Sequence, residues 1–348
     1  MSIQCPTPNH EDEVVLLGHG AGGRLTAELL ESLVLPAVGG GAGPLEDAAL
    51  LPSHPSLVMS TDSFVVSPLF FPGGDIGSLA VHGTVNDLAM RGAWPLALSV
   101  SLIVEEGLPL AELRSVMVSL GKAAQNVGVP VITGDTKVVG RGAADRLFIN
   151  TTGIGQRHEL LCLSAALARP GDAVLLSGPI GLHGTTVLST REGLGFESDI
   201  ASDTRPLHRL VRALAPLGEA VHVLRDPTRG GLAAALNEIA RDSSAAVEIE
   251  EHAVPVPQAV ASACDLLGLD PLVVANEGCL VAFVDATAAE AALAAMRSLP
   301  EGAQAVRIGE VLPQGQGQGP QGRVTMRTLV GARRIVEMPL GEQLPRIC

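Results

Sequence analysis

The sequence predicts an α/β protein with two domains. Its 348 residues are about twice the length of a typical domain, and 47% of them are hydrophobic, which is enough to build two cores. Stretches rich in β-branched residues alternate with stretches whose apolar residues recur every three or four positions. The turn sequence Arg169-Pro170-Gly171-Asp172 interrupts this alternation and marks a boundary between two domains.

The N-terminal region begins with a predicted strand at Val58–Val66, where β-branched residues are frequent. Pro72 and two glycines then end the strand, and Asp75 is placed to cap a helix. Apolar residues from Ile76 to Ala89 recur at helical spacing, so this helix should pack one stripe against a sheet. The same criteria predict a strand at Leu96–Val104, a helix at Leu110–Val127, and strands at Val129–Thr133 and Arg146–Ile154.

This β-α-β-α-β-β order predicts a sheet with helices on one face. The other face, if apolar, would need a second sheet or a second subunit, so we expect a homodimer. After the boundary, a strand at Ala173–Ser177 opens a second mixed region that runs to about Val311. The polar, glycine-rich stretch 313–322 is expected to form a hairpin loop between strands near Val306 and Val324.

Composition and charge exclude several classes of function. The chain has six phenylalanines, one tryptophan, no tyrosine and a formal net charge of −14, so nucleic acid is not an expected partner. No apolar stretch reaches the roughly 18 residues of a membrane-spanning helix, and Met1–Glu13 lacks the pattern of a signal peptide. The five cysteines form no C-x-x-C pair. We therefore expect a cytoplasmic protein with reduced thiols and no membrane contact.

Two glycine-rich turns precede helical patterns and could bind an anion. The turn Gly18-His19-Gly20-Ala21-Gly22-Gly23 lets backbone N–H groups approach a phosphate closely, although a flexible entry to the helix explains it equally well. The turn Asp226-Pro227-Thr228-Arg229-Gly230-Gly231 places Arg229 at the start of the predicted helix Leu232–Ala240. A capping turn with Thr228 as N-cap is the simpler alternative, but a cap does not require paired glycines.

Aspartates recur beside small residues near the predicted ends of elements, at Asp47, Asp62, Asp87 and Asp135. Carboxylates in such positions suit Mg²⁺, which prefers oxygen ligands and bridges them to nucleotide phosphates. For any single aspartate, a role in a turn or a helix cap is the more common explanation.

Three residues are candidates for catalysis. Lys137 and Glu277 are single charges in apolar or glycine-rich segments, where burial can shift the pKa; a structural ion pair is the alternative. Cys348 ends the chain, so its thiol would lie on a mobile tail that can enter another site, as a carrier group does. The spacing of the histidines does not indicate a zinc site.

Together these motifs resemble the HypE family of hydrogenase maturation factors, essentially from end to end. The resemblance is carried by Gly18–Gly23, Ser60–Ser63, Pro68–Gly74, Thr133–Val139, Asp226–Gly231, Ala275–Gly278 and the terminal Pro345-Arg346-Ile347-Cys348. The terminal motif is the most specific, because related ATP-using enzymes such as aminoimidazole ribonucleotide synthetase, selenophosphate synthetase and thiamine-monophosphate kinase lack it.

The resemblance implies a carbamoyl dehydratase that uses ATP and Mg²⁺. A carbamoyltransferase, HypF, would load a carbamoyl group onto Cys348, and ATP would drive its dehydration to a thiocyanate. The cyanide would then pass to iron on a HypC–HypD scaffold and become a ligand of the [NiFe]-hydrogenase centre. Glu277 and Lys137 would handle the amide protons, and the metal ligands would be Asp47, Asp62, Asp87 and Asp135. The residues expected to bind nucleotide are Gly18, His19, Gly20, Gly22, Gly23, Asp62, Asp87, Asp135, Asp226, Thr228 and Arg229.

The resemblance also implies the fold of aminoimidazole ribonucleotide synthetase. In that fold the N-terminal sheet pairs with its symmetry mate into a barrel, and a mixed α/β domain follows. We expect a glycine-rich loop and leading helix at 1–40, an ATP-binding and dimerisation domain at 41–168, a C-terminal domain at 169–338 and a mobile tail at 339–348. ATP would lie between the glycine loop and the dimer-forming domain, in contact with both subunits.

Two positions depart from the family pattern: Leu182, where relatives often carry Asp, and Cys279, where they often carry Lys or Arg. The lost charge would alter partner docking, and Cys279 could form a disulfide with Cys348 under oxidation. Two other functions are compatible with the sequence. A small-molecule ATP-dependent kinase or synthetase of the same superfamily would not need the tail, and a non-catalytic scaffold would bind Mg-ATP without turnover.

Overall fold

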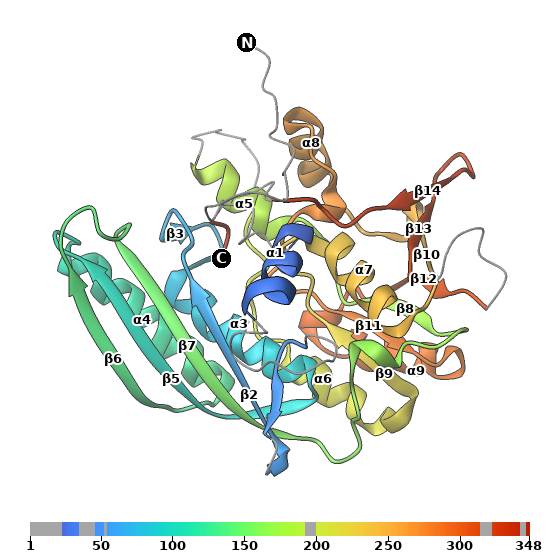
Figure 1. The fold of residues 1–348 in the computed structure, drawn as a ribbon, viewed down its shortest axis with the longest axis horizontal. Helices are drawn as coiled ribbons and strands as arrows, with labels where there is room; N and C mark the ends of the chain where they lie inside the picture. The colour runs from blue at the N-terminus through green and yellow to red at the C-terminus, as the bar shows by residue number, and fades with distance from the viewer. Residues whose placement is uncertain (1–22, 35–45, 52–53, 192–199, 314–321, 342–345) are drawn as a thin grey trace.

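Two sheets with their packed helices make up the chain in the computed structural model (Figure 1). The structure describes residues 23–34, 46–51, 54–191, 200–313, 322–341 and 346–348. A short helix, α1 (Arg24–Leu29), continues as one π-helical turn at Leu30–Val34 and precedes the first sheet. Among the described residues, no helix combines the length and the apolar character needed to cross a membrane.

The N-terminal sheet has five strands in the order β1-β2-β7-β5-β6. The β5–β6 pair is parallel and the other pairs are antiparallel. The strands are β1 (Ala49–Leu51), β2 (His54–Phe64), β5 (Ala93–Glu105), β6 (Val131–Val139) and β7 (Leu147–Arg157), with a separate hairpin of β3 (Phe70–Phe71) and β4 (Gly74–Asp75). With helices α3 (Ile76–Met90) and α4 (Leu110–Val127), the predicted β-α-β-α-β-β order is confirmed.

Helices α3 and α4 cover one face of this sheet, which leaves the opposite face open (Figure 1). Asp75 caps α3 as predicted, accepting hydrogen bonds from the backbone N–H groups of Gly77 and Ser78 at 2.8 and 2.9 Å. Strands β5 and β7 alternate in burial, as expected for a sheet with one packed face, whereas the edge strand β6 is exposed along nearly its whole length. On the open face, the exposed large apolar side chains are those of Met59, Leu96, Ile103 and Ile154.

The C-terminal sheet has seven strands in the order β14-β13-β10-β12-β8-β11-β9. The strands are β8 (Ala173–Leu176), β9 (Val221–Arg225), β10 (Val247–Glu250), β11 (Val281–Val284), β12 (Val306–Val311), β13 (Val324–Arg327) and β14 (Arg333–Val336). The helices are α5 (Leu182–Arg191), α6 (His208–Leu214), α7 (Gly231–Ser243), α8 (Gln258–Leu267) and α9 (Ala289–Arg297).

Both faces of the C-terminal sheet are covered. Strands β8 and β11 are buried along their whole length, so they carry continuous apolar runs instead of alternating ones. On one face α7 packs with Leu176 and Phe283 in one core cluster. On the other face α6 and α9 pack with Leu175 and Val284 in another.

Two predictions about the strands are wrong. Strand β6 does not end at Thr133, because parallel pairing with β5 continues as far as Glu105 and Val139, so Asp135 and Lys137 lie inside a strand. Strands β12 and β13 do not form a hairpin, because β10 lies between them, antiparallel to β12 and parallel to β13. The predicted loop at 313–322 lies for the most part outside the described residues.

Candidate active site

An acidic cavity of about 450 Å³ lies between the two sheets. Its walls come from α1, β2, α3, the segment from β9 into α7, and the stretch ahead of β11, with the C-terminal residue reaching in from the chain end. We call this the acidic cavity; its charged lining residues are Glu46, Asp47, Asp62, Asp87, Arg225, Asp226, Arg229, Glu238, Arg241 and Glu277.

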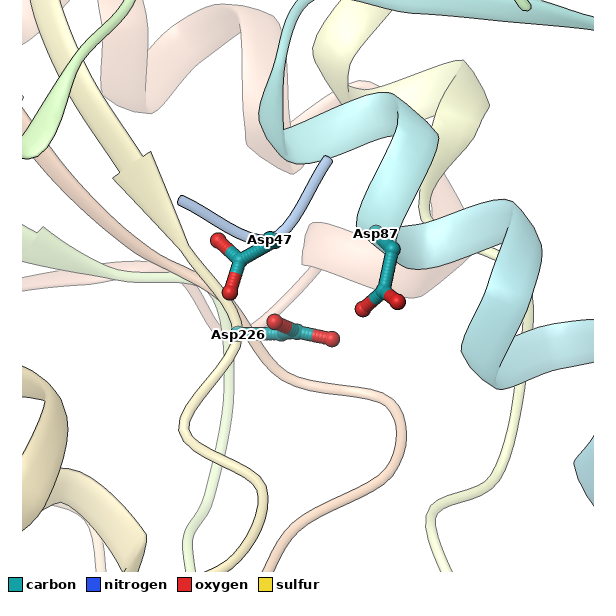
Figure 2. A group of neighbouring side chains, drawn as sticks. All are labelled: Asp47, Asp87 and Asp226. Atoms are coloured by element: carbon teal, nitrogen blue, oxygen red, sulfur yellow. The ribbon is translucent and has the colours of Figure 1, made fainter. Parts of the chain in front are cut away.

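Three carboxylates converge in this cavity (Figure 2). Asp47 precedes β1, Asp87 lies on α3 and Asp226 follows β9, and one oxygen of each lies within 4.8 Å of the others. Burial raises the pKa of Asp47 to about 8 and that of Asp226 to about 6. Burial, together with the charges of Asp226, Asp62 and Asp47, also raises the pKa of Asp87 well above its ordinary value. Such a cluster is costly as three bare anions and is suited to a divalent cation, which prefers carboxylate oxygens.

One hydrogen bond and one ion pair orient two of these carboxylates. Ser60 Oγ donates to Asp87 Oδ2 at 2.6 Å, and Arg225 Nε lies 3.1 Å from Asp47 Oδ1. Arg225 also contacts Glu238 at 2.5 Å. The guanidinium is therefore shared between two acidic groups, so it only partly offsets the negative charge of the cavity.

Glu277 lies buried on the wall of the same cavity, within the motif Asn276-Glu277-Gly278. Asn276 holds the motif in place by donating to the Pro227 carbonyl at 2.8 Å. The Asp203 carboxylate accepts from the N–H groups of Glu277 and Gly278, at 3.1 and 2.9 Å. Burial raises the pKa of Glu277 well above its ordinary value, and nearby aspartates raise it further. Glycine is required at 278 because a Cβ there would lie 1.8 Å from the Asp203 carbonyl oxygen.

The C-terminal Cys348 lies in the acidic cavity of its own chain, and Figure 1 shows the chain end inside the molecule close to α1. Burial raises the pKa of its thiol, and the charges of Glu277 and Asp62 raise it further, whereas Arg229 opposes them. In turn, proximity to Cys348 is the main cause that raises the pKa of Arg229. The docked thiol is therefore held in its protonated form.

Backbone hydrogen bonds dock the last three residues against residues 65–67. Val65 N–H donates to an oxygen of the Cys348 α-carboxylate at 3.0 Å, and Ser67 N–H donates to the Arg346 carbonyl at 3.3 Å. Arg346 Nε donates to the Val65 carbonyl at 3.0 Å, and its guanidinium pairs with Asp145. The Ile347 side chain is only 3% exposed and belongs to the N-terminal core.

His183 adds a side-chain anchor for this tail. Its Nε2 lies 2.8 Å from the Ile347 carbonyl, and its Nδ1 lies 2.7 Å from Ser202 Oγ. Burial lowers the pKa of His183, so the imidazole is neutral. Because the carbonyl can only accept, Nε2 carries the proton and Nδ1 accepts from the Ser202 hydroxyl.

The structure gathers most of the predicted site residues in one place. Glu277, Cys348, Asp47, Asp62, Asp87, Asp226, Thr228, Arg229 and Gly23 all line the acidic cavity. At Gly23 the backbone runs so close to the 339–341 segment that a Cβ would lie 2.3 Å from the Pro339 carbonyl oxygen. Gly18, His19, Gly20 and Gly22 lie outside the described residues.

Asp135 and Lys137 are not part of this cavity within a single chain. Both are exposed on β6, where Lys137 Nζ contacts Asp135 at 2.8 Å. That contact lowers the pKa of Asp135.

The capping alternative for the second glycine turn is wrong, because the N-cap of α7 is Gly230 and not Thr228. Cys279 is buried beside Ser177 and Gly178, and both it and Cys348 are free thiols. Three residues that contact this site or the docked tail, His183, Arg225 and Glu238, were not predicted from the sequence. Arg225 was detectable as the neighbour of Asp226, whereas the role of His183 depends on where the tail docks.

Comparison with known proteins identifies the family. The model of the N-terminal domain of AIR synthase related proteins matches residues 45–156, and that of the C-terminal domain matches residues 169–319. Carbamoyl dehydratase HypE of Cupriavidus necator is 52% identical over 335 residues, which cover 95% of this chain and 94% of that protein.

Two solved structures extend the likeness to three dimensions. A HypE–HypF complex contains a chain 47% identical, with a TM-score of 0.84, over 89% of this chain and 99% of the other. A HypE structure in complex with ATP is 51% identical, with a TM-score of 0.82, over 96% of this chain and all of the other. The two-domain fold is that of these HypE structures, as predicted, and the chain belongs to the HypE family of carbamoyl dehydratases.

Proposed function

We propose that this protein uses ATP to dehydrate a carboxamide carried on its own Cys348 to a thiocyanate. The observation that carries the proposal is the position of Cys348, which docks in a cavity shared with Glu277 and three converging aspartates. The HypE relatives named as carbamoyl dehydratases and the HypE structure with ATP support the same chemistry.

The reaction balances as S-carboxamide plus ATP giving thiocyanate, ADP, hydrogen phosphate and one proton. The carboxamide oxygen attacks the γ-phosphorus of ATP and displaces ADP. This step makes the oxygen part of a good leaving group. The nitrogen then loses its two protons as the C–O bond breaks, so that a C≡N bond forms and phosphate departs.

Glu277 is the group we assign to proton removal. Its carboxylate lies on the wall of the cavity that holds the Cys348 sulfur, and the bonds from Asn276 and Asp203 fix its backbone. A positioned base is typically worth a factor of about 10²–10⁴ in rate. Arg229, beside Cys348, is placed to stabilise negative charge on the transferring phosphoryl group.

The cluster of Asp47, Asp87 and Asp226 fits Mg²⁺ by the chemistry of its donors, which are three carboxylates with oxygens within 4.8 Å of one another. Asp62 lines the same cavity and is placed as a further ligand or a nucleotide contact. When bound, Mg²⁺ would neutralise the phosphate charges during phosphoryl transfer.

We propose that the protein acts as a homodimer whose second copy supplies Asp135 and Lys137. The apolar residues on the open face of the N-terminal sheet support pairing through that face. A mixed dimer tests this arrangement. In a dimer of one Lys137→Ala chain and one Cys348→Ser chain, the intact Cys348 and the intact Lys137 belong to different chains. Such a dimer should be active if the active site combines Cys348 of one chain with Lys137 of the other. If each active site uses the lysine of its own chain, the mixed dimer stays inactive.

The partners in this proposal are HypF, which would load Cys348 in the cytoplasm, and a HypC–HypD iron scaffold, which would receive the cyanide. The raised pKa of the docked thiol supports loading in an undocked state, because the thiolate is the nucleophile. A HypE–HypF complex in a relative supports the first partner.

Intact-mass spectrometry tests the function. With HypF and carbamoyl phosphate, the chain should gain one carbamoyl group at Cys348, and Mg-ATP should then remove one water. Cys348→Ser, or deletion of residues 346–348, should abolish both changes. A small-molecule kinase would keep its ATP turnover after this deletion, and a non-catalytic scaffold would hold carbamoylated Cys348 unchanged in the presence of Mg-ATP.

A further inference from the structure

A second cavity, of about 820 Å³, lies on the chain at a place the proposed chemistry does not use. It lies between the start of β5, the end of β7 with the residues that follow it, and helix α6. It shares no lining residue with the acidic cavity. We call it the Trp94 cavity, after the only tryptophan of the chain. Its volume is in the range of small-molecule sites, typically about 300–1,000 Å³.

A buried histidine without a hydrogen-bond partner forms part of its wall. His208 is 2% exposed, and neither ring nitrogen has a partner within the described portion of the chain. Burial lowers the pKa of His208 to about 4, so the neutral ring offers one donor and one acceptor. Unpaired buried polar atoms are unusual, and both nitrogens of this ring are closed off from the cavity, which meets other atoms of the residue.

Two arginines add positive charge to the same cavity. The Arg212 guanidinium lies over the Trp94 ring at 4.9 Å, and His208 meets this ring edge-on at 4.8 Å. Arg157 also lines the cavity, at the end of β7. Among the described residues neither arginine forms an ion pair, and Glu159, which also lines the cavity, pairs with neither.

The remaining lining is mixed. Leu161 and Val211 are buried side chains that form part of the wall together with Ala215, and Gln156 and His158 add polar groups. A molecule in this cavity would therefore meet an apolar wall, two cationic groups and the polar side chains of Gln156, His158 and Glu159.

We propose that the Trp94 cavity binds a small carboxylate with an apolar body. The apolar part would pack against Leu161 and Val211, and the carboxylate would accept hydrogen bonds from the guanidinium groups of Arg212 and Arg157. The Glu159 carboxylate opposes a ligand with a second negative charge, so a monocarboxylate is preferred over a dicarboxylate.

The fluorescence of Trp94 tests this proposal, because the chain has one tryptophan and no tyrosine. The probe is phenylacetate, and its uncharged counterpart phenylacetamide has the same shape. Phenylacetate should change the emission of the full-length protein saturably. Phenylacetamide should bind about tenfold more weakly, since it lacks the charge-assisted hydrogen bonds. Free N-acetyltryptophanamide controls for collisional quenching.

Two variants of helix α6 give a matched pair. Arg212→Gln should weaken phenylacetate binding about fivefold, the upper range for an exposed ion pair. Arg209→Gln removes an equally exposed charge that does not line the cavity and should change the affinity less than about twofold. No saturable change with phenylacetate, equal binding of the two probes, or equal loss in both variants would each overturn the proposal.

Discussion

Replacing Ile347 by alanine should release the C-terminal tail from the acidic cavity. The Ile347 side chain is 3% exposed and packs in the N-terminal core, while the hydrogen bonds around it involve only its backbone. Truncating a buried isoleucine typically costs about 2–5 kcal/mol. If the docked tail loses about 2 kcal/mol, the lower end of this range, the ratio of docked to undocked tail falls about 30-fold.

Alkylation of Cys348 measures this ratio. Iodoacetamide reaches the thiol when the tail is undocked, so the Ile347→Ala chain should be modified about 30-fold faster than the wild type, as followed by mass spectrometry of the C-terminal peptide. Ile335→Ala is the matched control, because Ile335 is 50% exposed on β14 and should leave the rate unchanged. Buried Cys279, read in the same digest, must stay unmodified, which excludes global unfolding.

Equal alkylation rates in the wild type and Ile347→Ala would refute the reasoning, because they would mean that the side chain does not hold the tail. A similar acceleration in Ile335→Ala would also refute it.

Three further predictions concern the acid groups and a partly buried histidine. Glu277→Gln should still be carbamoylated and bind ATP but dehydrate about 10²–10⁴-fold more slowly in single-turnover mass spectrometry; an unchanged rate would remove Glu277 as the base. Asp226→Asn should weaken Mg²⁺ binding at least about tenfold in calorimetry with ATP present. Asp285 is an exposed residue that caps a helical turn, so Asp285→Asn should leave Mg²⁺ binding unchanged. Equal effects of the two substitutions would contradict the metal site. Burial lowers the pKa of His82 to about 4, so the unfolded chain takes up the proton first and stability falls as pH drops below 6.5. His82→Gln should therefore lose about 2 kcal/mol less than the wild type between pH 7 and pH 5 in urea unfolding, and equal losses would contradict this account.

Local sequence patterns predicted the N-terminal elements well, because capping and periodicity are local. Asp75 is the cap that its position indicated, and the order of strands and helices from 54 to 157 is as expected. The end of β6 was misjudged because it depends on pairing with β5, which is far away in the sequence. The supposed hairpin after Val306 failed for the same reason, since β10 enters between the two strands from an earlier part of the chain.

The acidic cavity was predictable in its members but not in its geometry. Asp47, Asp87 and Glu277 were expected from their motifs, yet only the fold shows that Asp226 completes the cluster in place of Asp135. His183 could not be assigned a role from sequence, since its partner is a backbone carbonyl 164 residues away. Gly278 shows the converse case: its motif was recognised, and its physical cause, the close approach of Asp203, is visible only in the structure.

Transfer of oxygen from the carboxamide to phosphate tests the central claim most directly. Cys348 would be loaded with an ¹⁸O-labelled carbamoyl group, treated with Mg-ATP, and both the C-terminal peptide and the released phosphate analysed by mass spectrometry. The account predicts one labelled oxygen in phosphate for each thiocyanate formed on Cys348, with neither product in Cys348→Ser. Unlabelled phosphate alongside a carboxamide that stays intact on Cys348 would contradict it.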